Sequence, residues 1–196
     1  MHGAVHDCVV ACNWKLQSIL RTKRFYTDAD ILVTFQAHIL SFIEYRTMAI
    51  AHAAPSELQP LDDILTRLLV RLGISQEAAL MHFNLAPLNA RRDIALLGII
   101  HRAALRNGPP QFHQFFIRAH AIDGHGHSRI LYDPCVGRPL LFFRRSIFGL
   151  VRFYNRLPEE MVQIRDIATF QSMLQNMLRK AVTENMHNWH CIFRNT

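Results

Sequence analysis

The fold class is decided most clearly by Leu61-Asp-Asp-Ile-Leu-Thr-Arg-Leu-Leu-Val-Arg-Leu-Gly73. Its leucines and isoleucine recur at intervals of three and four residues, a spacing that places them on one face of an α-helix. Gly73 follows at once, where a residue with left-handed backbone dihedrals commonly ends a helix. The stretch therefore predicts an amphipathic helix that must bury its apolar face against other elements.

Apolar residues with the same spacing predict helices before and after this stretch. The predicted segments are 5–20, 28–54, 76–83, 89–105, 147–154 and 166–182. Thr27-Asp-Ala-Asp30 has the form of a capping box before the second segment, and Pro55 bounds that segment because proline cannot continue a helix. Ser128 to Tyr132 and Leu140 to Phe143 could pair as a small hairpin. We expect the first two helices to pack as a hairpin of helices.

The predicted fold class is thus mainly α, with three regions along the chain. Residues 1–116 form a helical bundle, residues 117–139 an irregular Gly/His/Pro loop or linker, and residues 140–196 a C-terminal helical segment. The middle region is assigned as a loop because Asp123-Gly-His-Gly-His127 and Asp133-Pro134 are rich in turn-forming residues.

Composition favours a folded, basic protein. The chain has 196 residues, half of them hydrophobic and 19% charged, which argues against intrinsic disorder. Its net charge is +7, and lysine occurs only at Lys15, Lys23 and Lys180, so nearly all the positive charge is arginine. Arginine offers forked donors suited to phosphate. Such a surface is expected to attract nucleic acid without sequence preference, the alternative being a basic surface that is merely solvated.

The sequence also indicates the cellular compartment of the protein and the redox state of its cysteines. Every apolar stretch is interrupted well short of the length that a bilayer requires, so no membrane span is predicted. The N-terminal residues lack the pattern of a secretory signal, and we expect an intracellular place, nuclear or cytoplasmic. Cys8 and Cys12, at helical spacing, read as small buried thiols, and no disulfide is expected.

Candidate nucleic-acid contacts come from basic residues that lie beside aromatic ones. The cations are Lys15, Arg21, Lys23, Arg24, Arg91, Arg92, Arg144 and Arg145. The candidate stacking residues are Trp14, Phe25 and Tyr26. Cations bind phosphates and flat rings stack on bases. The alternatives are that the aromatic residues belong to the core, that Asp93 confines Arg91 and Arg92 to a local ion pair, and that Phe142 and Phe143 beside the last two arginines are buried.

No catalytic centre is predicted. The adjacent acids Asp62-Asp63 lack the aromatic residue and the hairpin that hold the carboxylates of a polymerase palm, and they read as acids in the first turn of a helix. There is no nucleophile elbow or phosphate-binding loop. No cofactor is expected. We expect the chain to have no enzymatic activity on its own.

One low-probability metal site remains as a candidate. Asp123, His125, His127 and Cys135, with Tyr132 near them, include the ligand types that zinc prefers. Their spacing matches no standard zinc pattern, and exposed histidines in a glycine-rich turn are the alternative. A metal-dependent hydrolase around His125 and His127 is the function that such a site would imply.

Several short motifs occur in an order that resembles the thumb and post-thumb region of non-LTR, LINE-like retrotransposon reverse transcriptases. They are Ala11-Cys-Asn-Trp-Lys15, Phe42-Ile-Glu-Tyr-Arg46, Asn84-Leu-Ala-Pro-Leu88, Arg91-Arg-Asp-Ile94, Tyr154-Asn-Arg-Leu-Pro158 and Phe170-Gln171. The resemblance spans roughly Trp14 to Val182. It departs from the family at Tyr154, where the family motif often has tryptophan, and in lacking the palm, a Cys-rich knuckle and an endonuclease.

This resemblance implies a helical, thumb-like fragment of an RNA-directed DNA polymerase without its catalytic centre. The family's thumb lies against the primer-template duplex, so an RNA-DNA hybrid or RNA is the implied partner, bound through the backbone by a region that matches Lys15 to Arg24. The alternative is a protein-interaction or self-association module, whose candidate surfaces are the stretches Leu61 to Leu72 and Phe112 to Ile117.

Overall fold

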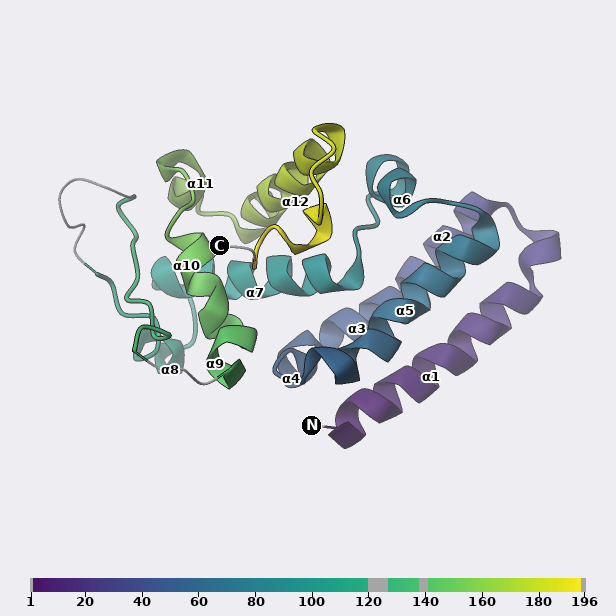
Figure 1. The fold of residues 1–196 in the computed structure, drawn as a ribbon, viewed down its shortest axis with the longest axis horizontal. Coiled ribbons are helices and arrows are strands. Elements are labelled where there is room, and N and C mark those ends of the chain that lie inside the picture. Colours follow the sequence, from purple (N-terminus) through teal and green to yellow (C-terminus); the bar gives the residue numbers. More distant parts are fainter. Residues whose placement is uncertain (1, 120–126, 138–140, 195–196) are drawn as a thin grey trace. The chain divides into compact units, whose positions relative to one another are not determined.

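The computed structural model describes residues 2–119, 127–137 and 141–194. These residues are mainly α-helical, as the spacing of apolar residues predicts (Figure 1). Among them the only β-pairing is an isolated antiparallel bridge between Arg118 and Leu131. In the described part of the chain, no helix combines the length and the apolar character needed to cross a bilayer. The chain divides into two compact units, residues 1–92 and 93–196.

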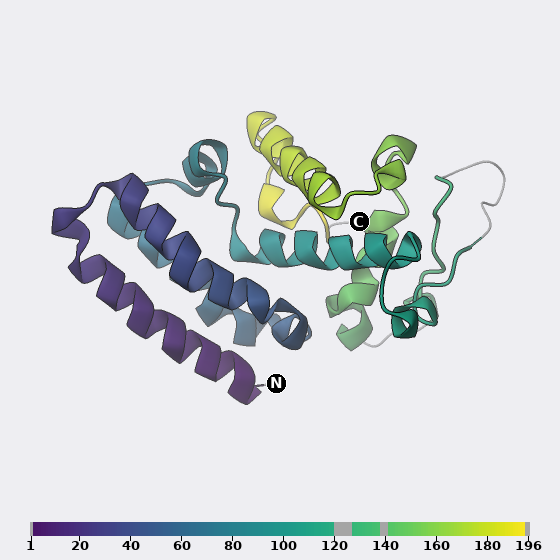
Figure 2. The same cartoon turned by 180° about the vertical axis from the view of Figure 1, so that it is seen from behind.

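The first unit is a set of helices packed around α1 and α5. Its elements are α1 (His2–Arg21), η1 (Lys23–Phe25), α2 (Asp28–Phe35), the π-helical turn η2 (Gln36–Leu40), α3 (Ser41–Tyr45), α4 (Thr47–Ile50), α5 (Pro55–Leu72), α6 (Gln76–Phe83) and the start of α7 (Leu88–Ala104). Helix α1 packs against both α5 and α2, and the three lie side by side in both views (Figures 1 and 2). The predicted hairpin of the first two helices is therefore confirmed.

The leucine-rich face of α5 forms the centre of this unit. All six apolar residues of the predicted stripe are buried, namely Leu61, Ile64, Leu65, Leu68, Leu69 and Leu72. They meet the apolar face of α1, formed by Val5, Cys8, Cys12, Leu16 and Ile19, and that of α2, η2 and α3. Because this stripe is the core, Leu61 to Leu72 is not the interaction surface that the sequence suggested.

The predicted helix ends in this unit are confirmed by their hydrogen bonds and dihedrals. Thr27 and Asp30 form the full capping box at the start of α2, and Ser75 accepts a hydrogen bond from the Ala78 amide. Gly73 ends α5 with φ = 70°. The segment predicted as one helix over 28–54 is instead interrupted, by the π-helical turn and again at Arg46, whose φ and ψ are −94° and −2°.

The second unit contains most of α7 and the helices after it. These are α8 (Pro110–His113), α9 (Leu141–Arg145), η3 (Ile147–Leu150), α10 (Val151–Tyr154), α11 (Glu159–Gln163), α12 (Ile167–Thr183) and η4 (Trp189–Cys191). Helix α12 contacts α11 and η4. Its N-cap is Asp166, which accepts hydrogen bonds from the amide and hydroxyl of Thr169. The predicted last helix is therefore confirmed.

The two compact units differ from the predicted division, which placed a linker at 117–139. The described part of that segment is hydrogen-bonded into the second unit. The Asn155 side chain accepts from the Leu131 amide at 2.9 Å and donates to the Leu131 carbonyl at 2.7 Å. Two backbone hydrogen bonds pair 117–119 with 130–132. Turn-forming residues thus mark an irregular segment here, and its side-chain partners tie it to one unit.

One local prediction is wrong, and one helix ends in a way that the sequence does not indicate. Leu141 to Phe143 lies in α9, so it does not pair with Ser128 to Tyr132, and Leu140 lies outside the described residues. Helix α7 ends at Ala104, and Arg106 takes the left-handed conformation with φ = 61°. Hydrogen bonds from Arg106 and Asn107 to carbonyls of the last turn hold this end, which explains why the left-handed position precedes Gly108.

Candidate nucleic-acid interface

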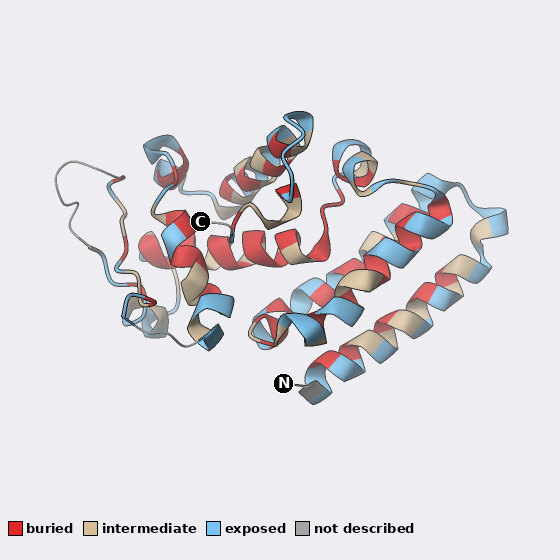
Figure 3. Cartoon of the chain, viewed as in Figure 1, coloured by how far each residue is buried: buried red, intermediate tan, exposed pale blue. Residues whose placement is uncertain are grey.

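Helix α1 has one buried face and one exposed face. Figure 3 shows buried and exposed positions alternating along α1. The buried face carries the core residues, and the opposite face presents Val10, Trp14, Gln17 and Arg21 to solvent. These four positions repeat at intervals of four, three and four residues, so they form a single stripe. Trp14 is 73% exposed. The alternative that Trp14 belongs to the core is therefore wrong.

The short helix η1 continues this exposed region. Phe25 is 69% exposed and Tyr26 is 58% exposed. The guanidinium of Arg24 lies over the Phe25 ring, 4.6 Å from its centroid, in a cation–π contact. No residue of η1 is buried. We call Trp14, Arg21, Arg24, Phe25 and Tyr26 the cation–aromatic surface, since each has an exposed side chain of the type that contacts nucleic acid.

The two lysines of the predicted set are held by the protein itself. The Lys15 ammonium donates to the His38 carbonyl at 3.1 Å and lies 4.0 Å from the centroid of the Phe42 ring. Lys23 donates to the Arg71 carbonyl in the last turn of α5, where a cation complements the helix dipole. Both keep their charge but are positioned by contacts within the first unit. We therefore leave them out of the cation–aromatic surface.

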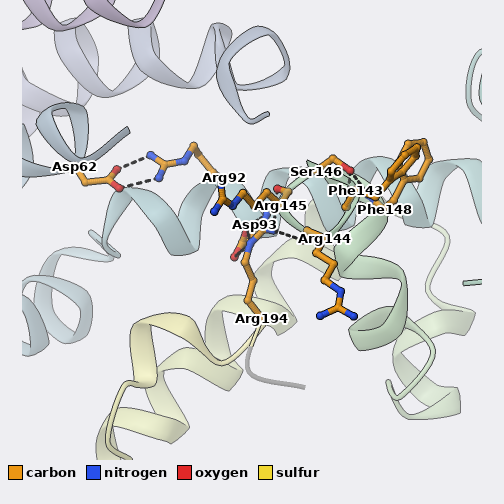
Figure 4. Close-up of polar contacts among 9 residues, drawn as sticks. All are labelled: Asp62, Arg92, Asp93, Phe143, Arg144, Arg145, Ser146, Phe148 and Arg194. Atoms are coloured by element: carbon orange, nitrogen blue, oxygen red, sulfur yellow. Dashed lines mark hydrogen bonds and ion pairs between the residues drawn. The ribbon is translucent and has the colours of Figure 1, made fainter. Parts of the chain in front are cut away.

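Arg91 and Arg92 are engaged by carboxylates of other helices in the first unit. Arg92 is buried and pairs through both terminal nitrogens with Asp62 of α5 (Figure 4). Arg91 pairs with Glu44 of α3. The prediction that Arg92 binds phosphate is wrong, because its side chain is buried. For Arg91 it stays a prediction, and a phosphate would have to displace the Glu44 carboxylate.

Loss of the Arg92 side chain should destabilise the first unit far more than loss of Arg91. In Arg92→Ala the partly buried Asp62 carboxylate loses its counter-charge, which should lower the free energy of unfolding by about 2–4 kcal/mol. In Arg91→Ala the half-exposed Glu44 is rehydrated, and the loss should stay below about 1 kcal/mol. Urea unfolding followed by circular dichroism measures both. Equal effects would contradict the assignment of Arg92–Asp62 as the structural pair.

Arg144 and Arg145 have exposed side chains at the end of α9. Their carbonyls, however, are structural: Arg194 donates through Nη1 to the Arg144 oxygen at 3.3 Å and to the Arg145 oxygen at 2.9 Å. Phe142 is exposed and Phe143 is partly buried, so the expectation that both are core is wrong for Phe142. These arginines remain candidate phosphate contacts of the second unit.

His127, one of the candidate metal ligands that the structure describes, is already hydrogen-bonded within the second unit. His127 is buried, and its Nε2 lies 2.9 Å from the Tyr154 carbonyl while its Nδ1 accepts from the Arg129 amide at 3.0 Å. Burial raises the pKa of the Cys135 thiol. Asp123 and His125 lie outside the described residues. Because both His127 nitrogens have partners, this imidazole has no lone pair free for a metal ion, and the described residues contain no cluster of metal-ligand type.

The adjacent acids Asp62 and Asp63 serve different partners. Asp62 accepts from Arg92, and Asp63 accepts from the Gln59 amide at 2.8 Å. Helix α5 begins at Pro55, so these acids lie two turns inside it and not in its first turn as predicted. Their carboxylates therefore act in packing between helices and in a local contact along α5.

Cys8 and Cys12 are buried free thiols, as predicted. A hydrogen bond from Cys12 lowers the pKa of Cys8 to about 7, and the same interaction with burial raises the pKa of Cys12. Their burial in the core of the first unit keeps them away from solvent, and we assign them to packing.

Sequence reasoning missed the polar cluster at the centre of the second unit. His101 is fully buried, with Nδ1 2.9 Å from the Tyr154 hydroxyl and Nε2 2.7 Å from the Ile164 carbonyl. A carbonyl only accepts, so Nε2 carries the proton and Nδ1 accepts from Tyr154. The ring also stacks on Phe170 at 4.0 Å. A lone histidine on a helix gives no sign of this, because its partners lie 53 to 69 residues away.

A shallow groove between α1 and α5 offers no prepared ligand site. It has a volume of about 410 Å³ and is lined by Val9, Asn13, Pro60, Asp63, Thr66 and Arg67. Its polar groups bond to protein: Arg67 donates to Asn13 at 2.6 Å, and Asp63 accepts from Gln59. A ligand would have to displace these contacts.

No protein-family model, curated protein or solved structure matches this chain. The fold class is therefore stated from the structure alone: a mainly α protein of two compact units. Its distinguishing surface feature is the cation–aromatic surface at the end of α1.

Proposed function

We propose that this chain binds nucleic-acid backbones without sequence preference and without catalysis, as a helical segment similar to the thumb region of a non-LTR reverse transcriptase. The observation that carries the proposal is the exposure of Trp14, Phe25 and Tyr26 next to Arg21 and Arg24. Isolated exposed apolar residues are common on protein surfaces. Three aromatic rings with two arginines within thirteen residues form instead the combination used to stack on bases and neutralise phosphates.

The wider electrostatics support the same proposal. The net charge of +7 favours encounter with any polyanion. Arg21 and Arg24 are exposed, whereas Arg91, Arg92 and Arg194 face carboxylates. The two exposed arginines at the end of α1 therefore lie in the same short stretch of chain as the exposed aromatic rings. Such a surface is expected to act wherever the protein meets RNA or DNA inside a cell.

Binding should fall as salt is added and should depend on Arg21 and Arg24. Each phosphate contact releases condensed counterions, so Arg21→Ala/Arg24→Ala should reduce the slope of log affinity against log salt by about 2 and weaken binding about tenfold or more at low salt. Fluorescence anisotropy of a labelled RNA-DNA hybrid and of labelled single-stranded RNA across a salt series measures this.

The matched control is Arg156→Ala/Arg165→Ala, which removes the same charge from exposed arginines of the second unit. It should change the slope little. If both double variants weaken binding equally, net charge alone is responsible, and the proposed surface is wrong. If the chain binds neither RNA nor hybrid at low salt, the proposed function is wrong.

A second candidate function is protein interaction or self-association through the second unit. Phe115 and Ile117 are about half exposed, although Phe116 between them is buried. Paired exposed apolar side chains of this kind can mark an interface. Light scattering after gel filtration should then detect a dimer that Phe115→Ser/Ile117→Ser converts to a monomer. A monodisperse wild-type monomer would contradict self-association.

A further inference from the structure

We infer that the cation–aromatic surface binds single-stranded nucleic acid in preference to a duplex, an inference that rests on the function proposed above. The thumb-like resemblance by itself implies a duplex partner. The exposed rings and the small number of available cations point instead to unpaired bases, and three observations carry this step.

The first observation is that the rings are open to stacking. Trp14, Phe25 and Tyr26 each expose more than half of their surface. In a duplex the faces of the bases are covered by neighbouring base pairs, so a protein meets only groove edges and phosphates. An exposed aromatic ring can stack on a base only when that base is unpaired. These rings would therefore add to the affinity for a single strand and contribute little to a duplex.

The second observation is that few cations are available for a duplex backbone. Among the predicted basic residues of the first unit, Lys15 and Lys23 donate to backbone carbonyls and Arg91 and Arg92 pair with acids. Arg21 and Arg24 remain at the surface, together with Arg71, which is exposed at the end of α5 where Lys23 contacts it. So few phosphate contacts give a weak interaction with only a shallow dependence on salt, because the slope of log affinity against log salt is proportional to the number of contacts. The remaining binding free energy would have to come largely from stacking. One well-stacked base can change the affinity more than about tenfold.

The third observation is the arrangement of charge and ring. Trp14 and Arg21 lie seven residues apart on one face of α1, about 10 Å along the helix axis. The Arg24 guanidinium rests on the Phe25 ring. Because the guanidinium covers one face of Phe25, a base would stack on the other face of this ring. This order of ring, cation, cation and ring along the chain suits a short flexible strand, which can turn successive bases toward the protein.

The two tryptophans make the inference testable, because Trp14 is exposed and Trp189 is buried in the other unit. The probes are a labelled oligothymidylate and the same strand annealed to oligoadenylate. We expect the single strand to bind at least about tenfold more tightly and to quench the Trp14 emission, since a stacked base contacts that ring. In Trp14→Phe the remaining emission, from Trp189, should not respond.

Variants separate stacking from charge. Phe25→Leu should weaken single-strand binding about tenfold and duplex binding much less, because it removes the stacking ring together with the cation–π contact that positions Arg24. The matched control is Tyr132→Leu, which removes an exposed ring of the second unit. This variant should change neither single-strand binding nor duplex binding. Circular dichroism verifies that the variants stay folded, as substitutions at exposed rings should.

The outcomes distinguish this inference from the proposed function. Duplex binding that equals or exceeds single-strand binding, with sensitivity to Arg21→Ala/Arg24→Ala, would overturn the single-strand preference and leave backbone binding in place. Single-strand binding without Trp14 quenching or an effect of Phe25→Leu would also overturn it. Failure of both probes to bind at low salt would remove the proposed function and this inference together.

Discussion

Gly149→Ala is expected to lower the free energy of unfolding of the second unit by about 3–5 kcal/mol, a large fraction of the stability of an ordinary domain. A Cβ atom at this position would lie 1.9 Å from the Arg144 carbonyl oxygen and 2.7 Å from its carbon. Contacts this short cannot exist, so the backbone would have to move. Flexible side-chain atoms can swing aside, but here the obstacle is main chain.

The Arg144 carbonyl is also held from its other side. Arg194 donates to it and pairs with the buried Asp93 of α7, with Nη2 2.7 Å from Oδ1 (Figure 4). Ser146 fixes the turn between α9 and η3, because its hydroxyl donates to the Phe143 carbonyl and accepts from the Phe148 amide. A shift that made room for alanine would break several of these hydrogen bonds. The cost therefore exceeds that of simple crowding.

The matched control for this prediction is Gly98→Ala in α7 of the same unit. The nearest atom to its added Cβ would be the amide nitrogen of Gln171, the far end of a flexible side chain. Alanine also favours a helix over glycine by about 1 kcal/mol, so this variant should be near neutral. Urea unfolding followed through Trp189, which is buried in this unit, measures both. Similar stabilities for the two variants would contradict the close packing at Gly149.

His101→Phe is expected to destabilise the second unit by about 2–4 kcal/mol at neutral pH. Phenylalanine keeps the stacking on Phe170, but the Tyr154 hydroxyl and the Ile164 carbonyl lose their buried partner. An unsatisfied buried polar group costs about 1–3 kcal/mol. Burial raises the pKa of Tyr154, so its hydroxyl remains a donor over the usual pH range. Tyr154→Phe, which removes a single hydrogen bond, should cost less.

The same histidine should make this unit sensitive to mild acid. Burial is the main reason that the pKa of His101 lies below its ordinary value of 6.5. Between the folded and unfolded pKa values the unfolded chain binds more protons, so stability falls as the pH drops below 6.5. The slope approaches about 1.4 kcal/mol per pH unit for one proton. At neutral pH both states are unprotonated, and this loss is absent.

Urea unfolding at a series of pH values between about 7 and 5 tests this acid sensitivity. Wild type and Tyr154→Phe should share the acid-dependent slope, since both contain His101. His101→Phe should lack the part of this pH-dependent slope that comes from protonation of His101. The window avoids Glu159, whose pKa is lowered to about 2 by hydrogen bonds from Gln163 and Ser128 and whose stabilising contribution is lost only at lower pH. An unchanged slope in His101→Phe would contradict the assignment.

The sequence predicted the helical fold class because the patterns that indicate a helix involve residues close together in the chain. The apolar spacing of Leu61 to Leu72, the capping box at Thr27 and the left-handed Gly73 each depend on neighbours within one or two turns, and each is confirmed. Where a local pattern has more than one solution, prediction was weaker. After α7, Arg106 occupies the left-handed position, although Gly108 lies only two residues further along the chain.

The candidate interface could be predicted only as a choice between alternatives. The run from Trp14 to Tyr26 holds rings and cations whatever the fold, but burial decides whether a ring is core or surface. Packing of α1 on α5 uses the face with Leu16 and leaves Trp14 in solvent. Arg92 shows the reverse case, since a cation that looked available is buried against Asp62.

The sequence alone therefore determined the helices, their caps and the basic character of the chain, because these depend on short-range spacing and composition. Tertiary structure decided which charges are free and which are paired. It also decided the buried cluster around His101 and the close contact at Gly149. These features join residues far apart in the chain or depend on how the backbone turns back on itself, and no local pattern records such contacts.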